Sequence, residues 1–187
     1  MKIIIGNPEV FAIELLIDSF LKYYPFGGCR LWIEGLFLGD IDNPGILTVN
    51  DNYFTSILAN KDNLYLEKKM NSSNFEIFEL IENLETSLYW FLINVEGFEC
   101  FHSYIYRQDD FFKVLWQLDR DLVNTEEYKN FSGDLFSAKV SIPIYEKVML
   151  DFRKFLAEAS PQLGLPLTYH MRLKIWRWQS HFGPRRA

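Results

Sequence analysis

The sequence predicts an α+β fold: a single domain with a mainly antiparallel sheet and helices packed on one face. Its 187 residues are 49% hydrophobic and 24% charged, a composition typical of one compact domain with its own core rather than of a disordered chain. Apolar segments with the alternation of strands are joined by short turns, which favours hairpins and meanders. Helical patterns interrupt these strands in groups, so we expect them to cover the sheet.

The first forty residues contain four strand patterns, at residues 2–5, 10–17, 30–33 and 36–38. The last two are separated only by Glu34-Gly35, so they predict a hairpin with glycine in the turn.

Two helices are predicted next. The first covers about residues 50–60, with Asp51 as its cap. The second begins with a capping box, in which Ser73 and Glu76 each satisfy a backbone amide of the other. Its apolar side chains repeat near i+3 and predict the buried face. These side chains are Phe75, Phe78, Ile81 and Leu84.

The C-terminal half of the domain predicts a meander and a long helix. Strand patterns occupy residues 89–95, 100–107 and 111–118, and a polar loop over 119–132 leads to a strand at 135–142. Pro143, at a first helical position, then begins a helix that continues to Glu158 and ends before Ser160-Pro161. Its predicted core face consists of Val148, Phe152, Phe155 and Leu156.

Charge divides the chain near residue 160. Residues 1–160 have a formal charge of −11, whereas residues 161–187 have +5 and no acidic side chain. An acidic body argues against nonspecific nucleic-acid binding by the main domain and suits a basic protein partner. We therefore expect an α+β domain over 1–160 and a basic, aromatic C-terminal extension over 161–187.

The extension allows two interpretations. Residues 167–175 alternate between apolar and polar side chains, which predicts an edge strand of the same domain protected by its basic residues. Alternatively, basic residues interleaved with aromatic ones can bind single-stranded nucleic acid by stacking and phosphate contacts, in a binding or regulatory module. The residues of that alternative are Arg172, Lys174, Trp176, Arg177 and Trp178.

The sequence predicts a cytoplasmic protein that does not associate with membranes. Its first apolar run is interrupted by Gly6 and Pro8, too early for a signal peptide, and no apolar stretch approaches the roughly 20 residues that cross a bilayer. Cys29 and Cys100 lie far apart without a CxxC pattern, so we interpret them as buried free thiols in a reducing compartment.

Residues that could catalyse a reaction or bind a metal form no motif. His102, His170 and His181 are scattered without the ligand spacing of zinc sites, so neither a metal nor a cofactor is expected. Cys100 with His102 would be the nucleophilic pair of an enzyme, but i,i+2 neighbours on a strand lie about 6 to 7 Å apart. We therefore expect a protein that is not an enzyme.

Acidic side chains gather instead at the predicted turns and loops. They are either solvated loop edges or an anionic surface that meets a cationic partner. The candidates for such a surface are Asp109, Asp110, Asp119, Asp121, Glu126 and Glu127.

Several motifs resemble family forty-two of the bacterial immunity proteins. Most of them lie in the first forty residues, and the resemblance extends over Met1 to Glu158, where a short strand leads into a C-terminal helix. The motifs are Ile4-Ile5-Gly6-Asn7-Pro8, Phe11-Ala12-Ile13, Phe26-Gly27, Leu31-Trp32-Ile33-Glu34-Gly35, Leu38-Gly39-Asp40 and Ala138-Lys139-Val140-Ser141-Ile142-Pro143.

The resemblance implies a cytoplasmic protein that binds and neutralises a cognate toxin C-terminal domain, such as that of a contact-dependent growth inhibition system, by occluding its active site or substrate surface. No catalytic residue carries over, because an inhibitor performs no reaction. We interpret Gly6, Gly35, Gly39 and Trp32 as turn and core positions. If the toxin is a nuclease with a basic groove, the acidic candidates could mimic phosphate groups.

Overall fold

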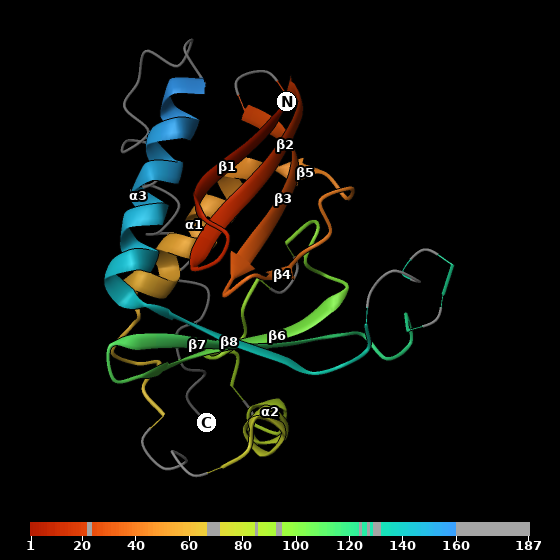
Figure 1. The fold of residues 1–187 in the computed structure, drawn as a ribbon, viewed down its shortest axis with the longest axis vertical. Coiled ribbons are helices and arrows are strands. Elements are labelled where there is room, and N and C mark those ends of the chain that lie inside the picture. Colours follow the sequence, from red (N-terminus) through yellow and green to blue (C-terminus); the bar gives the residue numbers. More distant parts are fainter. Residues whose placement is uncertain are drawn as a thin grey trace, which may run out of the picture.

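The strands form two antiparallel sheets, and the helices pack against them (Figure 1). The predicted α+β class is confirmed, although the strands are divided between two sheets rather than joined in one. The computed structural model describes residues 1–21, 24–66, 72–84, 86–92, 95–123, 125, 126, 128 and 132–159.

The large sheet has the order β1-β2-β3-β4, and the short β5 also pairs with β3. All of its pairs are antiparallel, and β1 to β4 lie side by side in the order in which they follow along the chain. The predicted hairpin with Gly35 in its turn is confirmed as β3 and β4. The strands are β1 (Lys2–Asn7), β2 (Phe11–Leu21), β3 (Tyr24–Ile33), β4 (Leu36–Leu38) and β5 (Gly45–Ile46).

The small sheet is a three-stranded meander. The meander predicted for residues 89–95, 100–107 and 111–118 is confirmed for its last two strands, while the third strand of the sheet is the one predicted at 135–142. Its strands are β6 (Phe101–Gln108), β7 (Phe111–Leu118) and β8 (Phe136–Ser141). Figure 1 shows that the small sheet crosses below the end of the large one, so side chains of both sheets meet in one core.

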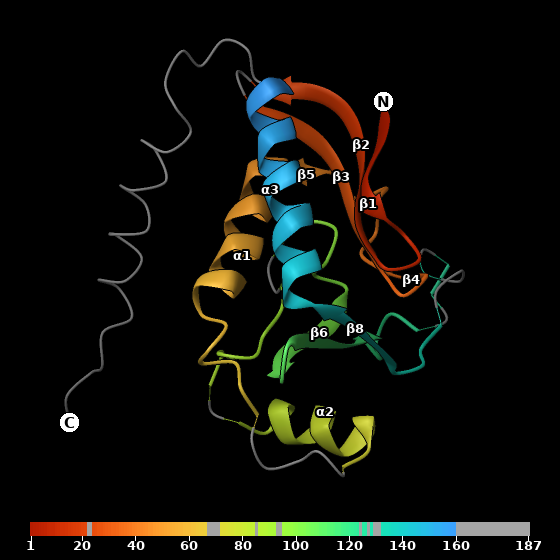
Figure 2. The ribbon, with the colours of Figure 1, turned by 60° about the vertical axis from the view of Figure 1, so that its left-hand side comes forward.

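The helices of the described residues are α1 (Leu47–Ala59), α2 (Asn74–Glu82) and α3 (Ile142–Ala159). Figure 2 shows α1 and α3 side by side on one face of the large sheet, where they cover the alternate residues Phe11, Ile13 and Leu15 of β2. The predicted core face of α3 is confirmed for Val148, Phe152 and Leu156, all buried, while Phe155 is only partly buried.

The second helix, α2, packs on the far face of the small sheet. Its capping box is present, because the Ser73 hydroxyl accepts from the Glu76 amide at 3.2 Å and the Glu76 carboxylate accepts from the Ser73 amide at 2.7 Å. The predicted face is wrong at Phe75, which is 54% exposed. The prediction is confirmed for Phe78 and Ile81, and Ile77 contacts the sheet in place of Phe75.

Two further predictions fail. Residues 89–95 form no named strand in their described part: Trp90 makes a single bridge to Tyr104, and Leu92 adopts a φ of 57°, which ends extended backbone. Phe91, Leu92 and Val95 of this segment are buried in the core that the two sheets share, which accounts for their apolar character. Asp51 does not cap its helix, since α1 begins earlier, at Leu47, and Asp51 lies buried in its second turn.

The predicted extension over 161–187, with its edge strand, lies outside the described residues. Within the part of the chain that is described, no helix combines the length and apolar character needed to cross a membrane.

Candidate functional site

The turn between β6 and β7 presents two of the predicted acidic residues, Asp109 and Asp110, both exposed. Asp109 has a φ of 53°, in the left-handed region that aspartate tolerates better than most residues. Arg107 Nε donates to the carbonyl oxygen of Asp109 at 2.8 Å, and the amide of Ile142 donates to the carbonyl oxygen of Asp110 at 2.9 Å. The backbone of the turn is therefore held from two sides.

A third acidic residue joins this turn from a distant part of the chain. The carboxylate of Asp62 pairs with Arg107 Nη1, and the Asp62 side chain is 81% exposed. The segment that carries Asp62 lies along β6, where the Arg107 amide donates to the Leu64 carbonyl at 2.7 Å. We call Asp62, Asp109 and Asp110 the acidic turn. No sequence signal points to Asp62, because its position depends on a contact across 45 residues.

The other predicted acidic residues lie at the opposite end of β7. The eight residues of this strand separate Asp110 from Asp119 by about 30 Å at 3.3 Å per residue. Asp121 and Glu126 are exposed near that far end of the strand, and Glu127 lies outside the described residues. The candidates are thus divided between two places and do not form one patch.

Asp119 is the most constrained of these carboxylates. The backbone amide of Asp121 donates to its Oδ1 at 2.9 Å, and its Oδ2 lies 3.1 Å from Nε2 of His102. The bond from Asp121 and, to a lesser extent, the contact with His102 lower the pKa of Asp119, against the opposing effect of burial. Asp119 therefore stays ionised, but both of its oxygens already have partners.

The geometry around Cys100 opposes a nucleophilic pair. Cys100 is 3% exposed, and burial raises its pKa to about 12. His102, in contrast, is exposed, and its Nε2 contacts Asp119 rather than the Cys100 thiol. Cys29 is also buried with a pKa raised to about 12, so the prediction of two buried free thiols is confirmed. Among the described residues, no group of three His, Cys, Asp or Glu side chains is arranged to hold a metal ion.

The outer face of the large sheet, opposite α1 and α3, carries a buried carboxylate. Glu14 is 2% exposed. Its Oε2 accepts from Trp32 Nε1 at 2.6 Å, and its Oε1 pairs with Lys2 Nζ at 2.6 Å. Arg30 Nη1 lies 3.9 Å from Oε2, and the Arg30 guanidinium stacks 4.5 Å from the ring centre of Phe37. These five side chains form the outer-face cluster.

The charge of Glu14 is maintained by its neighbours. Burial alone would raise the pKa of this carboxyl group, but the hydrogen bonds from Lys2 and Trp32 and the charges of Lys2 and Arg30 outweigh burial and lower the pKa. Glu14 is the single acid in an apolar stretch of β2, a signal from which the sequence could have indicated a buried ionic partner.

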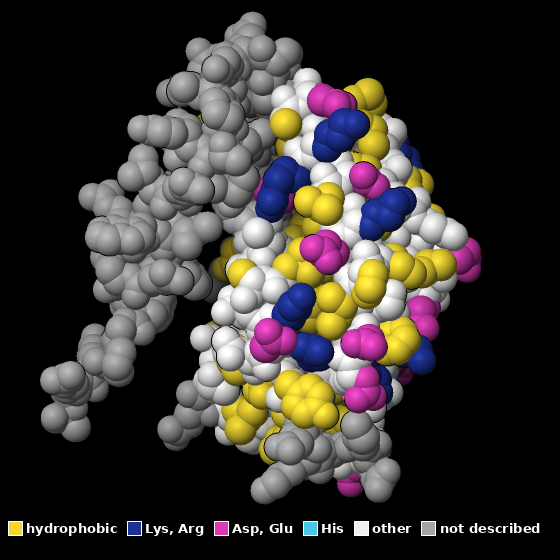
Figure 3. All heavy atoms as spheres, turned by 90° about the vertical axis from the view of Figure 1, so that its left-hand side faces the viewer, with side chains coloured by type: hydrophobic (Ala, Val, Ile, Leu, Met, Phe, Trp, Pro, Cys, Tyr) yellow, Lys and Arg dark blue, Asp and Glu magenta, His cyan; other side chains and the backbone are white. Residues whose placement is uncertain are grey.

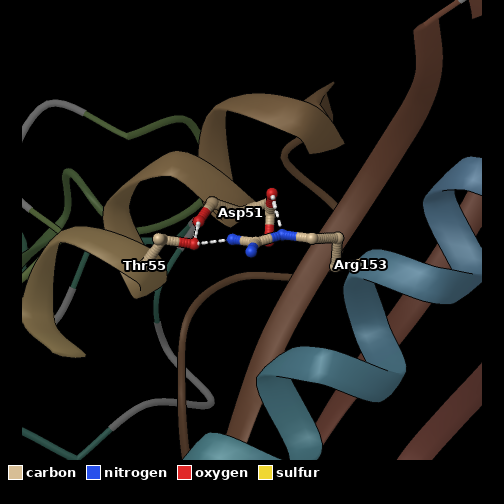
Figure 4. A network of polar contacts seen from close by, with 3 residues as sticks. All are labelled: Asp51, Thr55 and Arg153. Atoms are coloured by element: carbon tan, nitrogen blue, oxygen red, sulfur yellow. Dashed lines mark hydrogen bonds and ion pairs between the residues drawn. The ribbon is translucent and has the colours of Figure 1, made fainter. Parts of the chain in front are cut away.

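A second buried carboxylate joins α1 to α3 (Figure 4). Arg153 donates from Nε and Nη2 to the two oxygens of Asp51 at 3.2 and 3.3 Å, and Nη2 also contacts the Thr55 hydroxyl. Burial raises the pKa of Asp51, and Arg153 only partly offsets this. The pair therefore fixes how the two helices pack and is not available to a partner.

The exposed side of α3 has no single charge sign. Figure 3 shows basic and acidic side chains interspersed with apolar ones on this face. Two i,i+4 pairs lie along the helix, Lys147 with Asp151 at 3.8 Å and Lys154 with Glu158 at 3.9 Å. In contrast to this mixed face, the acidic turn presents Asp109 and Asp110 as exposed carboxylates on a fixed backbone, with the Asp62–Arg107 pair beside them.

Comparison with known proteins identifies the family. The model of the family Immunity protein 42 matches residues 3–155. The chain belongs to this family. A solved structure, CdiI from Burkholderia dolosa AUO158, is similar with a TM-score of 0.56 and 12% sequence identity, over 81% of this chain and 99% of that chain. At this identity the similarity shows the fold. No curated protein is similar enough to give a match.

Membership in an immunity protein family suggests a role without catalysis. The family motifs are placed partly as expected. Gly39 adopts a φ of 110°, and a Cβ there would lie 2.7 Å from Cε1 of Phe98. Trp32, however, is not a core residue. It lies opposite Ala12 of β2 with its side chain on the outer face of the sheet, away from the helices, and is only partly buried.

Proposed function

We propose that this protein binds the toxin domain of a contact-dependent growth inhibition system in the cytoplasm and neutralises it by covering the active site or substrate surface of the toxin. The observation that carries this proposal is the match to the immunity protein family over residues 3–155. The charge of −11 on residues 1–160 supports a basic toxin, such as a nuclease.

The acidic turn is the surface that we assign to this contact. Asp62, Asp109 and Asp110 come from two separate segments, and hydrogen bonds from the Arg107 side chain and the Ile142 amide hold the backbone of the turn before any partner binds. A surface that is ordered in advance loses little conformational entropy on binding. Carboxylates placed in this way could occupy the phosphate positions of a nuclease groove, and close charge pairs of this kind contribute about 1.5 to 7 kcal/mol.

Asp119, Asp121 and Glu126 are the second candidate surface. They rank behind the acidic turn because both oxygens of Asp119 already accept hydrogen bonds or ion pairs within the chain. A toxin domain large enough to span the small sheet could contact both places.

Two charge variants with equal charge change test the assignment. The first combines Asp109→Asn, which suits the left-handed backbone at that position, with Asp110→Lys. The matched control combines Glu79→Gln with Glu82→Lys on the exposed side of α2. The measurements are the affinity for the cognate toxin domain by calorimetry and the growth of cells that express that domain.

The acidic-turn variant should bind about a hundredfold more weakly, about 2.7 kcal/mol, and should protect cells poorly, whereas the control should match the wild type. Equal affinity of the acidic-turn variant and the control would remove the acidic turn from the interface. Failure of the wild type to bind or protect would instead remove the immunity function itself. The nucleic-acid alternative rests on residues outside the described part of the chain, and no observation favours it.

A further inference from the structure

The edge of the large sheet at β1 is open. Among the described strands, β1 pairs with β2 alone and stands at the end of the sheet. It is six residues long, and Lys2 and Ile4 on it are 64% and 47% exposed. An open strand edge is a template for pairing with another segment of chain.

The other strand edges in the described part of the chain are short or occupied. At β8, the Lys139 amide donates to the Glu34 carboxylate at 3.1 Å. Along β6, segments 64–66 and 89–91 make backbone hydrogen bonds. On the far side of the large sheet, β4 and β5 have three and two residues. Among the described strands, β1 is therefore the edge best suited to pair with a further strand.

The hydrogen-bonding pattern identifies the groups that point outward from β1. The amino group of Met1 donates to the Ile17 carbonyl at 2.7 Å, and the Ile17 amide donates to the Met1 carbonyl at 2.9 Å. Hydrogen-bonded and non-hydrogen-bonded pairs alternate along an antiparallel ladder. The amides and carbonyls of Lys2, Ile4 and Gly6 therefore point away from β2.

We propose that residues 167–175 of this same chain add to the β1 edge as a further strand of the large sheet. The proposal goes beyond the toxin-binding function and does not depend on it. This segment alternates in the manner of a strand with one apolar and one basic face. The apolar side chains are Tyr169, Met171, Leu173 and Ile175, and the polar ones are Thr168, His170, Arg172 and Lys174.

The charges of the segment and the domain are complementary. Residues 161–187 have a charge of +5 and the rest of the chain −11. Exposed acidic residues also lie near both ends of the β1 edge, Asp18 on β2 and Glu9 in the turn after β1. This charge balance favours the chain's own basic segment over a second acidic copy of the domain.

The connection leaves α3 at the end of the domain where β1 starts. In both Figure 1 and Figure 2 the C-terminal end of α3 and the start of β1 lie at the same end of the domain. Residues 160–166 between α3 and the segment can span up to about 23 Å at 3.3 Å per residue. A strand that starts from this end runs parallel to β1.

The apolar side of the segment fits the flank of α3. Val148 of α3 packs against β1 near Gly6, where its Cγ2 lies 3.0 Å from the position of an added Cβ. On the same flank, Ile144 is 39% exposed and Phe155 is partly buried. An added strand with its apolar face inward would cover these two side chains and leave its basic face in water.

Amide hydrogen exchange in the full chain, measured residue by residue by NMR, tests the proposal. The outward amides of Lys2, Ile4 and Gly6 should exchange at least about tenfold more slowly than solvent-exposed amides. Those of Ile3 and Ile5, which bond to β2, serve as internal references.

Two full-length variants separate strand addition from other causes. Met171→Asp with Leu173→Asp places charges on the apolar face and should abolish the protection of the outward amides. The matched control, Arg172→Gln with Lys174→Gln, changes the solvent face and should keep it. The reference amides should not change in either variant.

Three results would overturn the proposal. The outward amides could exchange in the wild type at the rate of free peptide. The apolar-face variant could leave their protection unchanged. Finally, protection that grows with protein concentration would show that a second copy of the chain occupies the edge.

Discussion

Replacing Glu14 with glutamine tests whether the outer-face cluster stabilises the large sheet. Glutamine keeps the size of the side chain and a carbonyl oxygen that can accept from Trp32 Nε1, now 2.6 Å from the carboxylate. It removes the negative charge that pairs with Lys2 and Arg30. The variant therefore isolates the electrostatic contribution of the carboxylate.

The structure sets the size of the effect. Lys2 is 64% exposed, so its ion pair contributes at most about 1 kcal/mol. The hydrogen bond from Trp32 changes from a charged to a neutral acceptor, which costs about 1 kcal/mol. Arg30 is only 18% exposed, and its Nη1 lies 3.9 Å from Oε2 of Glu14. In the variant, this largely buried positive charge would lose part of the negative charge that offsets it. We expect Glu14→Gln to lower the free energy of unfolding by about 2 kcal/mol at pH 7.

Urea unfolding followed by circular dichroism measures this difference, with Glu146→Gln on the exposed side of α3 as the control. The folded state lowers the pKa of Glu14 below its ordinary value of 4.5. The stabilisation is therefore fully present above pH 4.5 and is lost as the pH falls through the lowered pKa. The difference between wild type and variant should shrink from pH 7 to pH 3.

Equal unfolding free energies at pH 7 would refute the stabilising role of the carboxylate. A difference that stays constant down to pH 3 would refute its electrostatic origin.

Three further predictions concern the core and its charges. Arg153→Met should lower the free energy of unfolding by about 3 kcal/mol at pH 7 because it leaves the Asp51 carboxylate buried without its ion-pair partner. Burial raises the pKa of Asp51, so this loss should diminish as the pH falls through the raised pKa and Asp51 takes up a proton. Urea unfolding of both proteins at pH 7 and pH 4 measures the change. Cys29 and Cys100, both with a pKa of about 12, should resist a thiol reagent at pH 8 until urea unfolds the protein, whereas rapid reaction of the native protein would contradict their burial. Phe75→Ser should change the thermal midpoint little because the side chain is 54% exposed; a large fall would mean that Phe75 packs against the sheet.

Local signals in the sequence predict the local structure well. The capping box at Ser73 and Glu76 involves residues three positions apart, so no distant contact can override it. The alternation in residues 111–118 predicts β7 because one face of that strand meets the core and the other is shared between α2 and solvent.

The errors arise where burial comes from two sides. The apolar residues 89–95 predict a strand, but Phe91 and Leu92 are enclosed by the core and the backbone turns at Leu92. An apolar run of this length does not distinguish a strand from a buried turn. The core position expected for Trp32 is wrong for a different reason. Which face of the sheet a strand residue occupies depends on the register of the strand and not on the residue type.

Charged partners far apart in the sequence are not predictable from local patterns. Asp51 has the position of a helix cap, but it pairs with Arg153 from a helix about a hundred residues later. Asp62 joins the acidic turn through Arg107 in the same way. Such pairs depend on how whole elements pack, and a sequence pattern of ten or twenty residues contains no information about them.

Binding of the cognate toxin is the central claim, and one measurement tests it most directly. The full chain is used as bait in a lysate of the native strain at moderate salt, captured proteins are identified by mass spectrometry, and the affinity of the captured toxin domain is measured by calorimetry. We predict one toxin C-terminal domain bound with a Kd in the nanomolar range. Capture of nucleic acid alone, or no stable complex at micromolar protein, would contradict the immunity function.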